Sequence, residues 1–160
     1  METKKADEIV ERLQSHLKSD VLEVRVPRAR RIFLRVKTTS FKEAIRYAIL
    51  ELGFSHLSSI TGIDLGGEIE LIYHLAYRNA TELSLIIRVP KGDALVPTIS
   101  DLMPNSALYE REVHDLMGVR FDGLSDLSPL LLPDGWPKEI YPLRKEYTFS
   151  DLHEIKLKKS

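Results

Sequence analysis

The chain has 160 residues, enough for one domain, and its formal net charge of −1 gives no general attraction to nucleic acid or anionic lipid. It contains no cysteine, which excludes a disulfide, a thiolate-held iron–sulfur cluster and a cysteine nucleophile. No apolar run approaches the ~20 residues that cross a bilayer, and the charged N-terminus is unlike a signal peptide. We therefore expect a cytoplasmic protein that reaches any membrane through partners, without direct insertion.

The first quarter of the chain predicts one helix and two strands. Residues 4–19 place their apolar side chains on one stripe, which is typical of an amphipathic helix. Residues 22–26 and 31–37 alternate apolar and polar side chains, as half-buried strands do. Residues 27–30 form the turn between them.

A second helix follows. Ser40 and Glu43 have the spacing of a capping box, in which the hydroxyl and the carboxylate satisfy free amides at a helix start. The apolar stripe runs over residues 44–52, and Gly53 is a suitable terminator.

Three further strands are predicted at residues 56–63, 68–77 and 82–89, with turns at Gly66-Gly67 and Arg78-Asn79-Ala80. Their links are too short for crossover helices, so we expect these strands to run antiparallel. The fold class that follows is α+β, with a mixed, mainly antiparallel sheet and helices packed on one face. We assign residues 1–104 to this head domain.

The character of the chain changes after Pro104. Asn105 or Ser106 can cap a short helix that ends before Gly118. Beyond it no period persists, and four of the eight prolines fall in this stretch, which is nonetheless rich in leucine and aromatic residues. An apolar surface of this extent is normally buried against another surface. We interpret residues 105–160 as a short helix followed by an extended, irregular arm that wraps a partner.

The densest group of charged residues is the run 109–118. On a helix Glu110 faces His114 and Arg111 faces Asp115, each four residues apart. One interpretation is a solvated helix with two surface ion pairs of roughly 0.3–0.5 kcal/mol each. A metal site of Glu110, His114 and Asp115 is a weaker interpretation, because no second histidine shares that face.

Residues 109–123 resemble the signature of the thirty-kilodalton subunit family of respiratory complex I (NADH-quinone oxidoreductase). Its homologues include subunits of membrane-bound, energy-converting nickel–iron hydrogenases. An aromatic residue precedes Glu-Arg-Glu, and an Asp, a Gly, a Phe and another Gly follow in order. The resemblance extends to residues 60–64, 69–77, 83–89, 130–136 and 142–147. Two departures indicate a divergent branch: Leu-Ser-Asp at 124–126 in place of His-Pro-Asp, and His114 where an aromatic is common.

The resemblance implies a head and an arm that wraps a large catalytic subunit, with no catalytic residue, cofactor site or metal site in this chain. Our hypothesis is that acidic and basic groups of the signature fix the origin of the arm, that two glycines allow turns, and that aromatic residues anchor it. Trp136 could instead pack on its own domain, and the basic pair near the end could be solvated. The expected docking residues are Glu110, Arg111, Glu112, Asp115, Gly118, Phe121, Gly123, Trp136, Pro142, Arg144, Lys145 and Tyr147.

The implied function is that of a peripheral-arm subunit at the cytoplasmic face of the membrane. Its implied partners are the large catalytic subunit (49-kDa-like or a hydrogenase large subunit) and a small iron–sulfur subunit. Iron–sulfur clusters and, in hydrogenases, nickel–iron belong to those partners. The short chain, the lost His-Pro motif and a thermophile-like scarcity of amide side chains favour a ferredoxin-dependent hydrogenase or sulfur-reductase complex over complex I.

Two other classes of function stay open at this point. One is a metal-dependent phosphohydrolase that uses His114 and Asp115, although such enzymes are mostly helical. The other is a free-standing binding domain whose arm folds on its own head.

Overall fold

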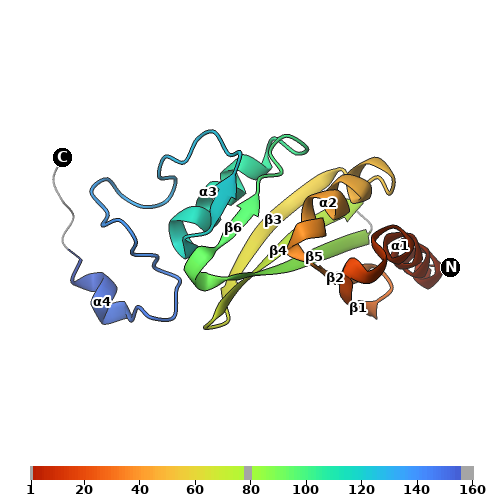
Figure 1. The fold of residues 1–160 in the computed structure, drawn as a ribbon, viewed down its shortest axis with the longest axis horizontal. Coiled ribbons are helices and arrows are strands. Elements are labelled where there is room, and N and C mark those ends of the chain that lie inside the picture. Colours follow the sequence, from red (N-terminus) through yellow and green to blue (C-terminus); the bar gives the residue numbers. More distant parts are fainter. Residues whose placement is uncertain (1, 78–80, 156–160) are drawn as a thin grey trace.

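The computed structural model describes residues 2–77 and 81–155, with side chains from residue 6 onward (Figure 1). The turn predicted at Arg78-Asn79-Ala80 lies outside these residues. In chain order the helices and strands are α1 (Glu2–Leu17), β1 (Val21–Arg28), β2 (Arg31–Val36), α2 (Phe41–Leu50), β3 (His56–Asp64), β4 (Glu68–Tyr77), β5 (Thr81–Pro90), β6 (Leu95–Pro97), α3 (Ser106–Met117), β7 (Arg120–Asp122) and α4 (Phe149–His153), with single 3-10 turns at Lys18–Asp20, Thr38–Ser40 and Lys91–Asp93.

Five strands form one sheet in the order β1-β2-β5-β4-β3. The pairs β1–β2, β3–β4 and β4–β5 are antiparallel, and β2–β5 is parallel. The chain leaves β2 through α2, forms the β3–β4–β5 meander, and returns β5 to the side of β2. The prediction of a mixed, mainly antiparallel sheet is confirmed.

The core lies on one face of this sheet, under α1, α2 and α3 (Figure 1). Alternate side chains of β2 and β4 are buried there, and the ring of Phe41 on α2 lies 4.6 Å from that of Tyr73 on β4. The opposite face is not covered by these helices and carries an ion pair between Arg88 and Glu70 at 2.7 Å, although Ser84 and Ile86 of β5 are buried on it. The alternation of apolar and polar residues in the sequence therefore identified the buried face of the sheet correctly.

The capping box predicted at Ser40 is wrong. The Ser40 side chain makes no cap hydrogen bond to α2 and donates instead to the carboxylate of Asp20. Glu43 pairs with His16 on α1 at 2.9 Å. A capping box does occur at Thr148 and opens α4, an element that the sequence did not predict.

Two short strands, β6 and β7, were also missed. They pair in parallel, with Val96 opposite Phe121, and hold the two ends of the segment that contains α3. Three residues are too few for a periodic signal. Gly118 ends α3 in the left-handed conformation (φ 71°), as predicted.

Candidate docking surface

Helix α3 packs on β3 and carries most of the signature. Val113 and Met117 point into the core, and Met117 lies against Gly62 of β3, where an added Cβ would be 3.0 Å from Met117 Cγ. The helix therefore packs on the sheet of the head, and the irregular segment begins after β7. The division of the chain at residue 104 stays a prediction.

Glu110 is fully buried and holds the loop that follows β6. Its carboxylate accepts hydrogen bonds from the amide of Ile99 at 2.9 Å and from the hydroxyls of Thr98 at 2.5 Å and Ser106 at 3.3 Å. Burial raises the pKa of Glu110, and these hydrogen bonds partly oppose the rise. Burial, with the nearby charge of Glu110, also raises the pKa of Tyr73 well above its ordinary range.

The enclosure of Glu110 corrects its expected role. A carboxylate that is 0% exposed contacts no partner surface, and it forms no pair with His114. The Nδ1 atom of His114 instead lies 2.8 Å from the carbonyl oxygen of Val119, so Nδ1–H donates to that oxygen.

Asp115 and Arg111 hold the start of the arm. Asp115 is 5% exposed and accepts hydrogen bonds from the amides of Leu130 at 2.7 Å and Leu131 at 2.8 Å. Arg111 donates to the carbonyl oxygen of Ser128 through two nitrogens, at 3.0 and 2.9 Å, and pairs with Asp126 at 3.1 Å. The ion pair predicted between Arg111 and Asp115 is thus replaced by two contacts that fix residues 126–131.

A second attachment lies further along the arm, at Asp64 at the end of β3. The Asp64 side chain, 1% exposed, pairs with Lys91 at 2.6 Å and accepts a hydrogen bond from the amide of Lys145 at 2.9 Å. The hydrogen bond from Lys91 is the largest cause that lowers the pKa of Asp64, and it outweighs the effect of burial. Lys91 also pairs with Glu146, so one ammonium group bridges the head and the arm.

Sequence reasoning gave Asp64 and Lys91 no role. The available signal was an acidic residue at the end of a strand, on the same face as Ile60, whose side chain is buried in the core. A carboxylate on a buried face requires a partner. That partner comes from residues 27 and 81 positions away in the chain, which no local pattern reveals.

Arg144 closes the second attachment on α3. Its Nε donates to the carbonyl oxygen of Met117 at 2.8 Å, and its guanidinium lies 4.4 Å from the ring centre of Tyr141. The amide of Leu143 donates to the carbonyl oxygen of Leu116 at 3.1 Å. Arg144, one of the expected docking residues, therefore satisfies a free carbonyl at the end of α3 and holds the arm on its own chain.

The remaining expected docking residues differ in their surroundings. Phe121 is 3% exposed and lies in the core, so it does not anchor the arm on a partner. Trp136 and Tyr147 are half-buried and brace the arm internally, through Trp136 Nε1 to the oxygen of Ile140 (2.8 Å) and Tyr147 Oη to the oxygen of Glu139 (3.1 Å). Gly123 turns with φ 86°; Glu112 and Pro142 are half-buried, and the Lys145 side chain is exposed.

Two hollows flank α3. One, of about 440 Å³, lies between α3 and the arm and is lined by His114, Leu127, Leu132, Trp136 and Tyr141 among others. The other, of about 300 Å³, runs between α3 and β3; it contains Glu112 and Tyr109 and is closed by Leu143. Both offer recesses for partner side chains beside a fixed arm.

The arm leaves a large apolar surface in solvent. No residue from 125 to 155 is buried, and five large apolar side chains are exposed. They are Leu127, Leu130, Leu131, Leu143 and Phe149. The head does not cover this surface, so the arm is fixed at two points yet unpartnered along its outer side (Figure 1).

Residues 2–77 and 81–155 contain no group of three or more His, Cys, Asp or Glu side chains arranged to hold a metal ion. Within the same residues no helix combines the length and apolar character of a membrane span.

Comparison with known proteins identifies relatives over most of the chain. Residues 34–152 match the family described as the 30 Kd subunit of respiratory-chain NADH dehydrogenase. The chain is 33% identical over 142 residues to the C subunit of F(420)H(2) dehydrogenase from Methanosarcina mazei, covering 87% of this chain and 89% of that one. It is 36% identical to the beta subunit of the membrane-bound hydrogenase from Pyrococcus furiosus (72% and 69% covered) and to the C subunit of NADH-quinone oxidoreductase from Acidothermus cellulolyticus (60% and 52% covered).

Solved structures share the fold. A chain in the structure of the membrane-bound sulfane sulfur reductase, an archaeal respiratory membrane complex, superposes with a TM-score of 0.83 and 31% identity over 94% of this chain and 89% of that one. The trypsin-resistant fragment of Nqo5 superposes with a TM-score of 0.64 and 23% identity, over 77% and 99%. The resemblance seen in the motifs is confirmed: this chain belongs to the family of the 30 kDa subunit of respiratory-chain NADH dehydrogenase.

Proposed function

We propose that this protein is a non-catalytic, peripheral subunit of a membrane-anchored redox complex related to complex I, in which its arm docks a larger catalytic subunit. The observation that supports this proposal is that the arm is fixed to its own chain and still exposes apolar side chains. It is attached through Asp115 and Asp64, yet it exposes leucines along residues 127–143. A segment already ordered by its own chain loses little entropy on binding, which favours a permanent docking surface.

The docking role divides between two sets of residues. Glu110, Asp115 and Arg144 hold α3 and the arm in place, and the exposed leucines and Phe149 make the contact surface. Trp136 lines the hollow beside α3, where an apolar side chain of the partner would fit. Lys145, whose side chain is exposed, is placed to meet an acidic group on that partner.

The branch we favour is a ferredoxin-dependent hydrogenase or sulfur-reductase complex. The likeness to the sulfane sulfur reductase chain extends over 94% of this protein at 31% identity, and the C subunit of NADH-quinone oxidoreductase from Acidothermus cellulolyticus is also a relative, matched over 60% of this protein. The corresponding subunit of complex I is the second candidate, because that relative carries the name of NADH-quinone oxidoreductase. In either branch the partners would be a large catalytic subunit and a small iron–sulfur subunit, which would hold all of the metal cofactors at the cytoplasmic face of the membrane.

A phosphohydrolase site at His114 and Asp115 has less support. Nδ1 of His114 is engaged by a backbone oxygen, and Asp115 is held by backbone amides of the arm. Stoichiometric metal in the purified protein would revive this function.

Co-purification tests the docking role. The affinity-tagged chain with Leu130→Ser, Leu131→Ser and Phe149→Ser should lose most of the large subunit that it retains from detergent-solubilised membranes, because these side chains are exposed on the arm. The matched control replaces exposed leucines of the head, Leu22→Ser with Leu50→Ser, and should retain it. Equal retention by both variants would contradict the proposal. The identity of the retained large subunit distinguishes the two branches.

A further inference from the structure

The hollow between α3 and β3 lies along a free edge of the sheet. β3 is the last strand in the order β1-β2-β5-β4-β3, so only one of its two edges pairs with another strand of the sheet. Four consecutive residues of β3, 59–62, line this hollow of about 300 Å³. Because successive side chains of a strand point to opposite faces, a hollow that touches all four lies beside the unpaired edge. Helix α3 forms its other wall (Figure 1).

This edge presents unpaired backbone groups. The amide of Leu65 donates to the carbonyl oxygen of Glu68 at 2.8 Å, which makes these residues a hydrogen-bonded pair at the turn from β3 to β4. Hydrogen-bonded and non-hydrogen-bonded pairs alternate along an antiparallel ladder, so Ile60 and Gly62 belong to the second kind. Their amides and carbonyls therefore point away from β4, and no other element of residues 2–77 and 81–155 donates to or accepts from them. Such groups are a short template for another strand.

Glu112 adds a negative charge to the opposite wall. It lines the hollow from α3, is half-buried, and makes no hydrogen bond or ion pair with the part of the chain that the structure describes. The other ionisable side chains next to it in the signature are all engaged within the chain: Glu110, Arg111, His114 and Asp115. A half-buried carboxylate is best satisfied by a cation. Glu112 is thus the signature charge that remains available to a partner.

The walls of the hollow suit a long basic side chain. Tyr109 and Leu116 lie about one turn to either side of Glu112 on α3 and line the same hollow. The aliphatic stem of a lysine or arginine can lie along them while its charged end reaches the carboxylate. Leu143 closes the hollow, and its side chain, 58% exposed, belongs to the apolar surface of the arm. One partner can therefore contact both the arm and the hollow.

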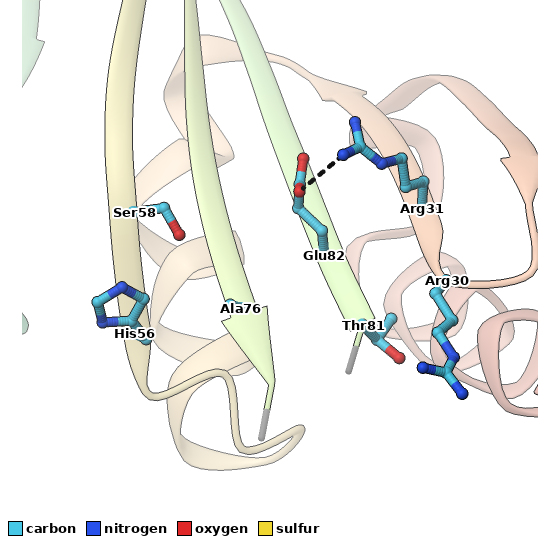
Figure 2. Close-up of a pocket in the computed structure, with 7 residues that line it drawn as sticks. All are labelled: Arg30, Arg31, His56, Ser58, Ala76, Thr81 and Glu82. Carbon is cyan, nitrogen blue, oxygen red and sulfur yellow. Dashed lines mark ion pairs between the residues drawn. The ribbon is translucent and has the colours of Figure 1, made fainter. Parts of the chain in front are cut away.

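A second polar hollow, at the start of β3, offers no such charge. Figure 2 shows His56 and Ser58 on its β3 side. Its charged side chains, Arg30, Arg31 and Glu82, all have partners of their own, and Arg31 pairs with Glu82 at 3.7 Å. The unpaired charge that favours a ligand lies in the hollow between α3 and β3.

We propose that an extended segment of the larger partner subunit adds to the edge of β3 as a short sixth strand, and that a lysine or arginine of this segment pairs with Glu112. This inference rests on the proposed docking function. Backbone hydrogen bonds at Ile60 and Gly62 fix the register of the segment, and the charge selects a basic one. A second copy of this chain is disfavoured, because pairing of two β3 edges would bring the two Glu112 carboxylates towards each other.

Charge reversal at Glu112 tests the ion pair by co-purification. Glu112→Arg in the affinity-tagged chain should reduce the large subunit retained from detergent-solubilised membranes about tenfold, because an attraction becomes a repulsion. Glu112→Gln keeps the shape of the side chain and should reduce it about threefold. Glu11→Arg, at an exposed acid on α1, is the matched control and should retain the subunit like the parent. Thermal unfolding of these variants should match that of the parent, since Glu112 has no partner in the described chain.

Hydrogen exchange at single residues tests the added strand, with the free full chain compared with the solubilised complex. In the free chain the amides of Ile60 and Gly62 should exchange faster than those of Thr61 and Ile63, which pair with β4. In the complex the amides of Ile60 and Gly62 should slow about tenfold or more, because each gains an acceptor.

The outcomes separate this inference from the docking function. Parental retention by Glu112→Arg, with loss by the arm variant at Leu130, Leu131 and Phe149, would overturn the inference and leave the docking function in place. Parental retention by both variants would overturn both. Equal losses for Glu112→Arg and Glu11→Arg would reduce the effect to net charge and overturn the ion pair. Unchanged exchange at Ile60 and Gly62 in the complex would overturn the added strand.

Discussion

The ring of Tyr141 lies directly on Gly118, the residue that ends α3. A Cβ added to Gly118 would be 2.5 Å from Cζ and 2.6 Å from Cδ2 of that ring. Gly118 also has a φ of 71°, which side chains of L-residues disfavour. One glycine thus serves both the end of the helix and the return of the arm over it.

Gly118→Ala should therefore destabilise the protein and loosen the arm. The backbone conformation alone costs about 1–2 kcal/mol, which corresponds to a fall of roughly 2–8 °C in Tm, and displacement of Tyr141 adds to it. Gly67→Ala is the matched control, since nothing lies within 4 Å of an added Cβ there and its φ is not in the left-handed region. Equal Tm values for the two variants would contradict the assigned contact.

Asp64→Asn should release the second attachment of the arm. The change weakens hydrogen bonds to Lys91 and to the Lys145 amide, at a cost of about 1.5–3 kcal/mol. The hydrogen bond from Lys91 is the main cause that holds the pKa of Asp64 below its ordinary value of 3.8, so this stability is present above that pH and is lost as the pH falls below it. The Tm of the parent should fall as the pH is lowered through the acid range, and the Tm of the variant should fall less. Parallel curves of Tm against pH would contradict the assigned role of Asp64.

Glu110→Gln should remove a pH dependence of stability whose sign is opposite to that from Asp64. Burial raises the pKa of Glu110, so the folded state binds the proton more tightly and stability from this group decreases as pH rises above the ordinary pKa of 4.5. The free energy of unfolding, measured with urea, should decrease less between mildly acidic and neutral pH in this variant than in the parent. Glu110→Ala leaves the Ile99 amide without its acceptor and should cost more, about 1–3 kcal/mol, at every pH.

Arg111→Lys should free the start of the arm without unfolding the head. A lysine keeps the charge near Asp126 but cannot donate through two nitrogens to the oxygen of Ser128. Loss of about 1 kcal/mol of local stability corresponds to roughly fivefold faster tryptic cleavage at exposed Lys138. Arg120→Lys, at an exposed pair with Asp93, is the control and should leave the cleavage rate unchanged. An unaltered rate for Arg111→Lys would show that Asp115 holds the arm alone.

The elements that the sequence predicted correctly are those with a sustained period. Alternation in residues 68–77 depends on which side chains reach the core, and the same alternation appears in the burial of β4; in β5, the strand at the centre of the sheet, residues 83–87 are all buried. The prediction from local sequence failed at Ser40, because its hydroxyl donates a hydrogen bond to Asp20 on a distant segment and does not cap α2. Beta strands of three residues and a helix of five are too short to carry a period at all.

For the docking surface, the sequence by itself determined the motif, the family it belongs to and the excess of apolar residues in the arm, because these are properties of composition and order. Only the tertiary structure decided which charged residues face inward. Glu110 and Asp115 were expected to fix the origin of the arm; Asp115 does so through the amide of Leu130, whereas Glu110 accepts a hydrogen bond from the amide of Ile99 in the loop after β6. Arg144, an expected docking residue, donates to a carbonyl of its own chain. The physical reason is that a loop and a helix end must satisfy their own polar groups when they pack, and the residues that do so lie far apart in sequence.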